Sequence, residues 1–285
     1  MSGDGLLVVD KPSGWTSHDV VARGRRLMGT RRVGHAGTLD PMATGVLVLG
    51  VERATRLLGH LQGHDKSYDA TLRLGAVTST DDAEGEVVST TDASGVGDEA
   101  LDKAVAALRG PIEQLPPAYS AIQVGGVRSY AAARRGESIE LTPRPVVVQQ
   151  LEVLARRGDE VDVRVRCSAG TYIRALARDI GAALGVGAHL TALRRTASGP
   201  WTLADAHPLD DDLPAHLIPI ADAAVRAFPR WDVDADVATV IGHGGKLDGP
   251  GLGPGPTAVF GPDGSLLSIA EEHQGQLRYL AVFPP

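Results

Sequence analysis

The chain has 285 residues, 43% of them hydrophobic, so it can bury a sizeable core in one large domain or in one large and one small domain. Its net charge is −7, and its single cysteine, Cys167, excludes an internal disulfide and a cysteine-based metal site. The longest clean apolar stretch, residues 46–49, is far shorter than the roughly 20 residues of a membrane helix, so we expect a cytoplasmic protein without a membrane partner.

The N-terminal part of the chain predicts two short buried strands with a helix between them. The apolar run 6–10 indicates the first strand, which ends in a turn. Thr16 or Ser17 can cap the helix, whose first turn contains Asp19, a favourable charge beside the positive end of the helix. Residues 45–50 predict the second strand.

A glycine-broken loop, residues 31–41, leads into this second strand and holds a single carboxylate, that of Asp40. An isolated Asp-Pro pair is more often a turn residue that caps its own backbone. Here the loop begins with two arginines, Arg31 and Arg32. Gly34 and Gly37 leave its backbone open to close approach by a ligand. This composition is typical of a functional loop.

The middle of the chain predicts a second group of strands. Alternating side chains indicate strands at residues 68–74 and 161–167, and residues 146–148 and 151–154 are two further candidates. The polar, glycine-bearing segment 118–140 predicts a mobile arm that is disordered or displaced without a ligand and closes when one is bound.

Two helices are predicted in the same region. Residues 100–108 indicate a short amphipathic helix that ends near a Gly-Pro pair. In the helix that follows residue 172, the spacing places Arg174 and Arg178 together, away from the face that packs on the core. That core face consists of Ile173, Leu176, Ile180 and Leu184.

Near residues 210–230 the sequence contains a run of aspartates and several prolines, which predicts a domain boundary. Short apolar runs beyond it predict strands at residues 258–260, 266–270 and 277–283. We therefore predict a catalytic domain at residues 1–225 and a small β-rich domain at residues 229–285, near the size at which a core becomes marginal by itself.

Seven short motifs follow one another in a fixed order within residues 5–205. They are Asp10-Lys11-Pro12, Gly34-His35-Ala36-Gly37-Thr38-Leu39-Asp40-Pro41, Gly45-Val46-Leu47 running on to Ala54-Thr55-Arg56, Lys66-Ser67-Tyr68, Asp82-Ala83-Glu84-Gly85, Gly170-Thr171-Tyr172-Ile173-Arg174 and Leu193-Arg194-Arg195. In this order and spacing the chain closely resembles the TruB-type tRNA pseudouridine synthases. It departs from them at Ala169, where many relatives have a basic residue, and at Trp15, where methionine is common.

The resemblance implies both a fold and a site. The fold is an α/β (α+β) pseudouridine synthase fold, with a mixed, largely antiparallel sheet and a central cleft, plus a small PUA-like domain at the C-terminus. The catalytic residues it implies are Asp40 as the catalytic aspartate, Tyr68 as the aromatic partner of the target base and Arg174 as the arginine beside the aspartate. The substrate-binding residues it implies are His35, Lys11, Tyr172, Gly37, Thr38, Leu193 and Arg178.

The implied reaction converts uridine to pseudouridine at position 55 in the T-arm of tRNA. Breaking the glycosidic bond leaves positive charge on the ribose, which the Asp40 carboxylate can stabilise or capture. Arg174 within about 4–6 Å would keep that carboxylate ionised and oriented. Nothing is oxidised and no group is imported, so we expect neither a cofactor nor a metal. Attack on C1′, attack on C6 and deprotonation at C2′ all use the same carboxylate and stay open.

A uracil inside a folded loop is stacked, so the enzyme has to flip it into a pocket. Tyr68 can stack on the flipped base, and His35 can fill the vacated stack or bond a neighbouring base. Without the resemblance, a core tyrosine and a satisfied loop histidine are ordinary interpretations of these two residues. Lys11 is expected to anchor the first turn against the Asp40 loop, and Tyr172 to pack beside the pocket.

The net charge alone argues against a nucleic-acid partner, but the distribution of charge favours one. Residues 1–60 hold 8 basic against 5 acidic side chains and residues 121–200 hold 12 against 7, and these two blocks carry most of the motifs. We expect a monomer that binds the T-arm stem-loop of tRNA. Two rival functions stay open, an RNA-folding chaperone and a metal-assisted hydrolase that would use His18, His35 and Asp40.

Overall fold

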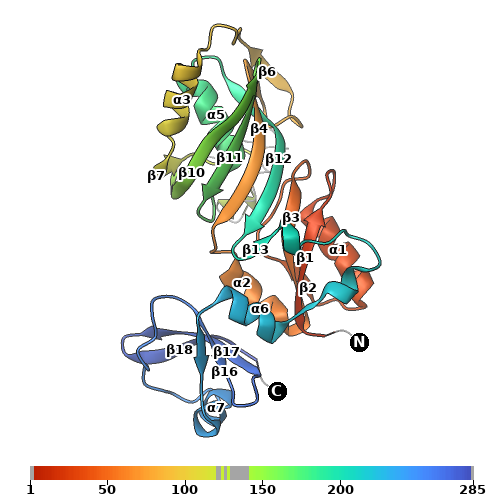
Figure 1. Ribbon diagram of the computed structural model, residues 1–285, viewed down its shortest axis with the longest axis vertical. Helices are drawn as coiled ribbons and strands as arrows, with labels where there is room; N and C mark the ends of the chain where they lie inside the picture. Colours follow the sequence, from red (N-terminus) through yellow and green to blue (C-terminus); the bar gives the residue numbers. More distant parts are fainter. Residues whose placement is uncertain (1–2, 120–122, 125–126, 129–140, 284–285) are drawn as a thin grey trace. The chain divides into compact units, whose positions relative to one another are not determined.

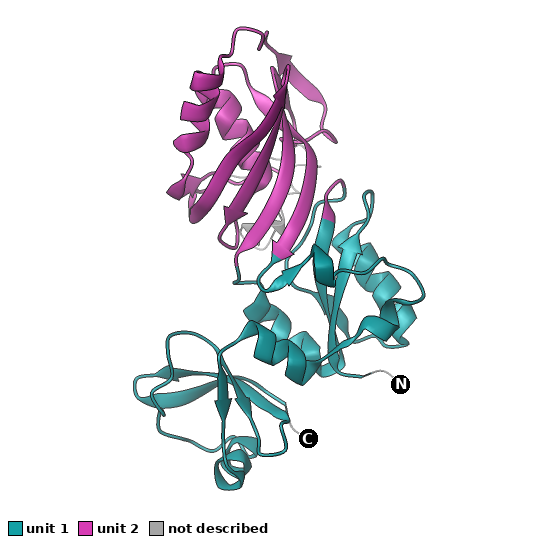
Figure 2. Ribbon diagram, viewed as in Figure 1, with its two compact units in different colours: residues 1–41, 45–64, 198–285 teal, residues 42–44, 65–197 magenta. Residues whose placement is uncertain are grey.

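The computed structural model describes residues 3–119, 123–124, 127–128 and 141–283. The chain divides into two compact units (Figure 2). Unit 1 contains Met1–Pro41, Gly45–His64 and Ser198–Pro285, and unit 2 contains Met42–Thr44 and Asp65–Ala197. The domain division predicted at residues 225–229 is a different partition of the chain, and it stays a prediction.

Unit 1 is built on the two apolar strands predicted near the N-terminus. Strand β1 (Gly5–Lys11) pairs antiparallel with β3 (Thr44–Val51) along its whole length and with the short β14 (Ile218–Pro219). Strand β2 (Val33–His35) pairs antiparallel with β3. Nearly every residue of β1 and β3 is buried, which explains why both strands are continuous apolar runs and do not alternate.

Helix α1 (Ser17–Met28) begins and ends at the residues that its sequence favours. Thr16 is the N-cap, as predicted, and it forms a capping box with Asp19, so that each side chain bonds the backbone of the other residue. Gly29 ends the helix in the left-handed conformation, with φ of 63°. Five further helical segments belong to this part of the unit, namely η1 (Glu52–Leu57), α2 (Leu58–Leu61), η2 (Leu203–Asp205), η3 (Leu213–His216) and α6 (Ile220–Ala227).

The C-terminal part of unit 1 is a four-stranded sheet with one helix (Figure 1). Its order is β15 (Arg230–Asp232), β16 (Thr257–Phe260), β17 (Leu266–His273) and β18 (Gln276–Val282), with β15 parallel to β16 and the other pairs antiparallel. Helix α7 (Ala235–Gly242) lies between β15 and β16 in the chain and contacts β17. The three strands predicted after residue 257 are confirmed.

This sheet shares its core with the N-terminal strands. Phe260, Ile269 and Phe283 belong to the same cluster of buried side chains as Leu6 of β1 and Leu57 of η1. A second, smaller cluster around Ile241 and Val259 is internal to the C-terminal part. The marginal size of residues 229–285 is thus compensated by a core that continues into the rest of unit 1.

Unit 2 contains a sheet of five long strands in the order β12 (Ala188–Ser198), β4 (Lys66–Leu74), β11 (Glu160–Cys167), β10 (Arg144–Arg157) and β7 (Gly110–Gln114). The pairs β4–β11, β11–β10 and β10–β7 are antiparallel. Helix α3 (Asp98–Ala106) packs on β10, and α5 (Ile173–Ala183) packs on α3 and β4 (Figure 1). Strands β5 (Ala76–Thr78) and β6 (Val87–Thr90) form a separate hairpin.

The prediction of two strands at 146–148 and 151–154 was wrong, because both belong to the single strand β10. The register of β10 against β11 shifts between Val148 and Gln150 and again between Val153 and Ala155. Each bulge interrupts the alternation of side chains, so one bent strand resembles two short ones in the sequence. The alternation predicted for 161–167 is confirmed, and Cys167 at its end is buried.

The α/β class with largely antiparallel pairing is confirmed. Most of the predicted arm 118–140 lies outside the described residues, which include only residues 118–119 and the antiparallel pair β8 (Gln123–Val124) and β9 (Val127–Arg128). Within the described ranges, no helix combines the length and the apolar character needed to cross a membrane.

The shared core of unit 1 predicts a large loss of stability when the fully buried Phe260 is replaced by alanine. We expect Phe260→Ala to lower the free energy of unfolding by about 4 kcal/mol, since the cluster that contains Leu6 and Leu57 loses a ring. Urea denaturation measures this loss. Val87→Ala, at a residue that is 62% exposed, is the control and should be nearly neutral. A loss below about 1 kcal/mol would refute the shared core.

Candidate active site

Asp40 lies half-buried in the loop that joins β2 to β3, and both of its chain neighbours are anchored. Leu39 is buried, and the Ser17 hydroxyl accepts from its amide at 2.9 Å and donates to its carbonyl at 3.1 Å. The Gly14 amide donates to the Pro41 carbonyl at 2.9 Å. The backbone is therefore fixed on both sides of the carboxylate.

Lys11, the last residue of β1, is fully buried and reinforces this anchoring. Its ammonium group donates to the carbonyls of Pro12 at 2.9 Å, Trp15 at 2.6 Å and Pro41 at 3.0 Å. These bonds tie the turn before α1 to the Asp40 loop, as predicted for an anchoring lysine. A direct contact between Lys11 and substrate stays a prediction.

The remaining predicted residues of this loop lie around its glycine turn. Gly37 has φ of 90°, a conformation that side-chain-bearing residues rarely adopt, and Thr38 is exposed. The Ala36 amide donates to the Val48 carbonyl at 2.9 Å, which keeps the loop on β3. The ring of His35 is half-buried and meets the His18 ring edge to face, with 5.7 Å between the ring centroids.

In unit 2, Tyr68 lies on β4, is 8% exposed and faces Val165 of β11 across the ladder. Lys66, two residues earlier on the same face, is buried opposite Cys167. Burial, followed by the nearby Arg195 guanidinium, lowers the pKa of Lys66 to about 8. Burial raises the pKa of the Cys167 thiol to about 11, so this thiol stays protonated and unreactive at neutral pH. One buried strand face thus presents a phenol beside an ammonium group that loses its proton unusually easily.

Arg174 lies in the first turn of α5 and is 5% exposed, although the periodicity of the sequence places it away from the core face. Its guanidinium donates to the carbonyls of Thr80 at 2.9 Å and Tyr119 at 3.0 Å, and one of its nitrogens lies 3.4 Å from a carboxylate oxygen of Asp82. Asp82 is itself buried and accepts from the Thr80 hydroxyl at 2.5 Å. Arg174 is therefore held in one orientation by the loop before β6, and its pairing with Asp40 stays a prediction.

Arg178, one turn further along α5, is fixed by neighbouring groups. It donates to the carboxylates of Asp179 at 2.9 Å and Asp81 at 3.2 Å, and to the Leu115 carbonyl at 2.8 Å. Burial raises the pKa of Asp81, although the Arg178 charge opposes the rise. The two arginines thus lie side by side against the consecutive carboxylates of Asp81 and Asp82.

Tyr172 and Leu193 occupy structural positions beside these arginines. Tyr172 is the N-cap of α5, and its amide donates to the Gln114 side chain at 2.7 Å while the Gln114 amide group donates back to its carbonyl at 3.1 Å. Leu193 is buried on β12. Their contacts with substrate stay predictions.

The sequence did not identify three of the residues that position these side chains. Ser17 was considered only as a helix cap, Asp82 was part of a motif without a role, and Gln114 carried no signal. Each acts on a partner at least 22 positions away in the chain, and such pairs become visible only in the fold.

The structure gathers the predicted residues in two groups. Lys11, His35, Gly37, Thr38 and Asp40 belong to unit 1, whereas Tyr68, Tyr172, Arg174, Arg178 and Leu193 belong to unit 2. Across the described part of the chain, no three His, Cys, Asp or Glu side chains are placed to hold a metal ion.

The fold resembles solved structures along almost the whole chain. The crystal structure of a Cbf5-Nop10-Gar1 complex contains a chain that is 27% identical, with a TM-score of 0.75, covering 99% of this chain and 84% of that one. The structure of an H/ACA RNP bound to a substrate RNA containing 2′-deoxyuridine gives a TM-score of 0.73 at 26% identity, covering 99% of this chain and 85% of that one.

Family models match three consecutive parts of the chain. Residues 25–173 match the N-terminal domain of the TruB family pseudouridylate synthases, residues 174–219 match the tRNA pseudouridylate synthase B C-terminal domain, and residues 228–284 match the C-terminal part of tRNA pseudouridine synthase II. The likeness therefore extends beyond residues 5–205, where the motifs lie. Fold and matches together define a pseudouridylate synthase, an isomerase of RNA uridine.

The chain belongs to the TruB family. Among its relatives, the tRNA pseudouridine synthase B of Streptomyces griseus is 57% identical over 98% of this chain and 97% of its own length. The protein of the same name from a Mycobacterium species (strain KMS) is 54% identical over 99% of this chain and 97% of its own length.

The three carbonyl bonds of Lys11 predict that Lys11→Met loosens the Asp40 loop. Because three part-buried carbonyls lose a charged donor, we expect the free energy of unfolding to fall by roughly 3 kcal/mol. The Gly14 amide, which bonds Pro41, should also exchange its hydrogen faster. Lys103→Met, at an exposed lysine of α3, is the control and should leave both measurements unchanged. Unchanged protection of Gly14 in Lys11→Met would contradict the anchoring role.

The buried pair of Arg174 and Asp82 predicts that Asp82→Asn affects both stability and turnover. Both side chains are at most 6% exposed, so we expect unfolding to become easier by about 3 kcal/mol, because the arginine charge loses its carboxylate. Misplacement of the guanidinium should lower turnover roughly 100-fold.

The control for this variant is Asp162→Asn, which removes the partner of Arg157, a side chain that is 57% exposed. That pair is solvated, so its loss should cost about 1 kcal/mol or less. Equal effects of the two substitutions would show that Asp82 does not position Arg174.

Proposed function

We propose that this protein converts uridine to pseudouridine at position 55 in the T-arm of tRNA, with Asp40 as the catalytic carboxylate. The observation that carries the proposal is the 57% identity, along nearly the full length of both chains, to a protein named tRNA pseudouridine synthase B. A second support is the substrate RNA named for the H/ACA RNP, whose fold is similar.

The geometry of the Asp40 loop fits a group that has to meet a developing positive charge. Ser17, Lys11 and Gly14 fix the backbone on both sides of Asp40, so the carboxylate need not reorganise when the glycosidic bond breaks. In the proposed reaction it stabilises or captures the ribose cation, and the freed base rotates and is rejoined through C5.

Tyr68 and Arg174 take the two other catalytic roles in this proposal. Tyr68 stacks on the flipped uracil, since its ring is rigidly placed on a buried strand. Arg174 keeps the Asp40 carboxylate ionised, as a planar guanidinium can bond two carboxylates at once through its two edges. His35, Gly37 and Thr38 contact the T-loop, while Tyr172, Leu193 and Arg178 complete the pocket for the nucleotide.

The proposal needs no cofactor, since the reaction is an internal rearrangement of one nucleotide. We further propose that the protein acts as a monomer in the cytoplasm, with residues 1–225 as the catalytic domain and residues 229–285 as the PUA-like domain. The arm at residues 118–140 is proposed to close on the T-arm.

The test is incubation of the purified chain with an unmodified tRNA transcript, without added nucleotide or metal, followed by mapping of pseudouridine. The wild-type protein should modify position 55, and Asp40→Asn should lower the rate by at least about 10⁴-fold, because the amide cannot stabilise or capture a cation. Asp92→Asn, at an exposed aspartate, is the control and should retain the wild-type rate. Pseudouridine formed by Asp40→Asn at the wild-type rate would refute the assignment.

Retained tRNA refolding by Asp40→Asn would show that a chaperone activity coexists with the chemistry. Pseudouridine formation on a T-arm stem-loop that persists in a chelator would exclude the metal-assisted hydrolase.

A further inference from the structure

A tryptophan lies exposed beside the Asp40 loop. Trp15, in the turn between β1 and α1, is 37% exposed, whereas Trp201 in the core is 1% exposed. Its carbonyl accepts from the Lys11 ammonium group, which also bonds the Pro41 carbonyl, one residue after Asp40. The backbone of Trp15 is thus held by the same Lys11 ammonium group that fixes the proposed catalytic loop.

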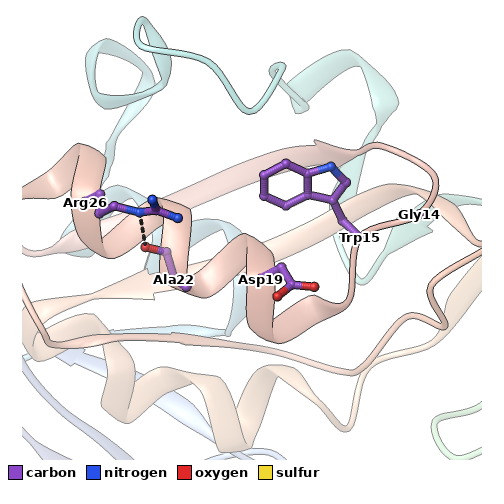
Figure 3. Close-up of a pocket in the computed structure, with 5 residues that line it drawn as sticks. All are labelled: Gly14, Trp15, Asp19, Ala22 and Arg26. Atoms are coloured by element: carbon purple, nitrogen blue, oxygen red, sulfur yellow. Dashed lines mark hydrogen bonds between the residues drawn. The ribbon is translucent and has the colours of Figure 1, made fainter.

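A shallow cavity of about 300 Å³ opens next to this indole, lined by Gly14, Trp15, Asp19, Ala22 and Arg26. The last three lie at intervals of three and four residues along α1 and therefore share one exposed face of the helix. Figure 3 shows the indole on the same side of α1 as the side chains of Asp19 and Arg26. We call this cavity the Trp15 notch.

The notch combines a ring, a carboxylate and a guanidinium. Hydrogen bonds from Thr16 lower the pKa of Asp19, so Asp19 is a carboxylate at neutral pH. Both bonds from Thr16 end on its Oδ2, which leaves Oδ1 as the oxygen that a ligand can reach. Arg26 is oriented by a bond from its Nε to the Ala22 carbonyl at 3.5 Å, and its two terminal nitrogens can donate to a phosphate.

The surroundings of the notch favour an anionic partner. Between residues 17 and 35 the chain carries five arginines against one aspartate, and only two of the five, Arg23 and Arg32, are paired with carboxylates from elsewhere in the described residues, those of Asp211 and Glu52. Aromatic rings next to cations are the usual platform for unpaired nucleotides, because every base has a face that can stack and a phosphate that can be neutralised. A carboxylate on the same platform accepts from the amino group that adenine, cytosine and guanine carry on a base edge, whereas uracil offers only its ring N3–H.

We propose that the Trp15 notch binds one unpaired nucleotide of the RNA substrate, whose base stacks on the indole and presents an amino group to Asp19 while its phosphate meets Arg26. This proposal rests on the proposed function, since it assumes that the substrate is the tRNA T-arm. The nucleotide is distinct from the uridine that reacts, because the proposed function stacks that uracil on Tyr68.

The test compares binding of a T-arm stem-loop by wild type, Trp15→Ala and Trp15→Phe. Trp15→Ala should weaken binding roughly tenfold, because one stacked base is lost, whereas Trp15→Phe keeps a ring and should lose much less. The thermal midpoints of both variants, measured alongside, detect any change in folding. Equal affinity of Trp15→Ala and wild type would overturn the proposal.

Abasic substitution in the RNA identifies the bound nucleotide. Each unpaired position of the stem-loop is made abasic in turn, and each RNA is tested with wild type and with Trp15→Ala. At one A, C or G position the two losses should not add, since both remove the same contact. Additive losses at every position would show that the ring acts only through folding of the turn, and coupling only at the uridine that reacts would refute a separate nucleotide site.

Arg26→Gln tests the phosphate contact. It should weaken binding and lower the slope of log affinity against log salt by about one, while Lys103→Gln on α3 should change neither. An unchanged slope would remove Arg26 from the notch. All of these tests measure binding, so they can fail while wild-type protein still forms pseudouridine, and the absence of pseudouridine with wild type would refute the proposed function instead.

Discussion

A buried ammonium group holds together the part of the structure on which the proposed chemistry depends. Lys11 ends an almost wholly apolar strand, and its charge would be costly there without compensation. Three backbone carbonyls supply that compensation, two from the turn before α1 and one from the Asp40 loop. A lysine suits the position because its three donors diverge from one atom, whereas the planar fork of an arginine would direct its donors into one plane. The Asp40 loop is therefore held in its conformation because one of its carbonyls, that of Pro41, helps to compensate the buried charge of Lys11.

Unit 2 also withdraws charged side chains from solvent, but there carboxylates, and not backbone carbonyls, compensate the positive charges. Arg174 of α5 is buried and Arg178 is half-buried, and the consecutive carboxylates of Asp82 and Asp81 pair with them. Because these carboxylates follow the short strand β5, the orientation of Arg174 depends on a hairpin that is separate from the main sheet. In both units a buried charge fixes a loop, and each loop or helix turn carries a residue of the proposed site.

Much of this could be predicted from the sequence, where the physics is local. The apolar runs of β1 and β3, the Thr16 cap and the alternation of β11 all follow from short-range rules. The prediction failed where a distant partner decides the outcome. The helical periodicity that placed Arg174 away from the core assumes that a charge avoids burial, and Asp82, 92 positions earlier in the chain, removes that cost. The bulges of β10 likewise depend on its pairing with β11, which no local pattern encodes.

The C-terminal part of the chain contributes to the stability of unit 1, but its charge does not favour contact with RNA. Phe260 and Phe283 extend the core of the N-terminal strands, so this part contributes stability to unit 1. Residues 228–285 hold three basic against seven acidic side chains, and two of the three cations, Arg230 and Arg278, are paired with Asp232 and Glu271. A phosphate approaching this surface meets repulsion and finds cations that are already engaged. Residues 1–60 and 121–200 instead hold more basic than acidic side chains, so we expect most of the affinity for tRNA to come from these blocks, which carry the Asp40 loop, Arg174 and the Trp15 notch. Binding energy is in this way concentrated on the segments that have to be ordered for catalysis.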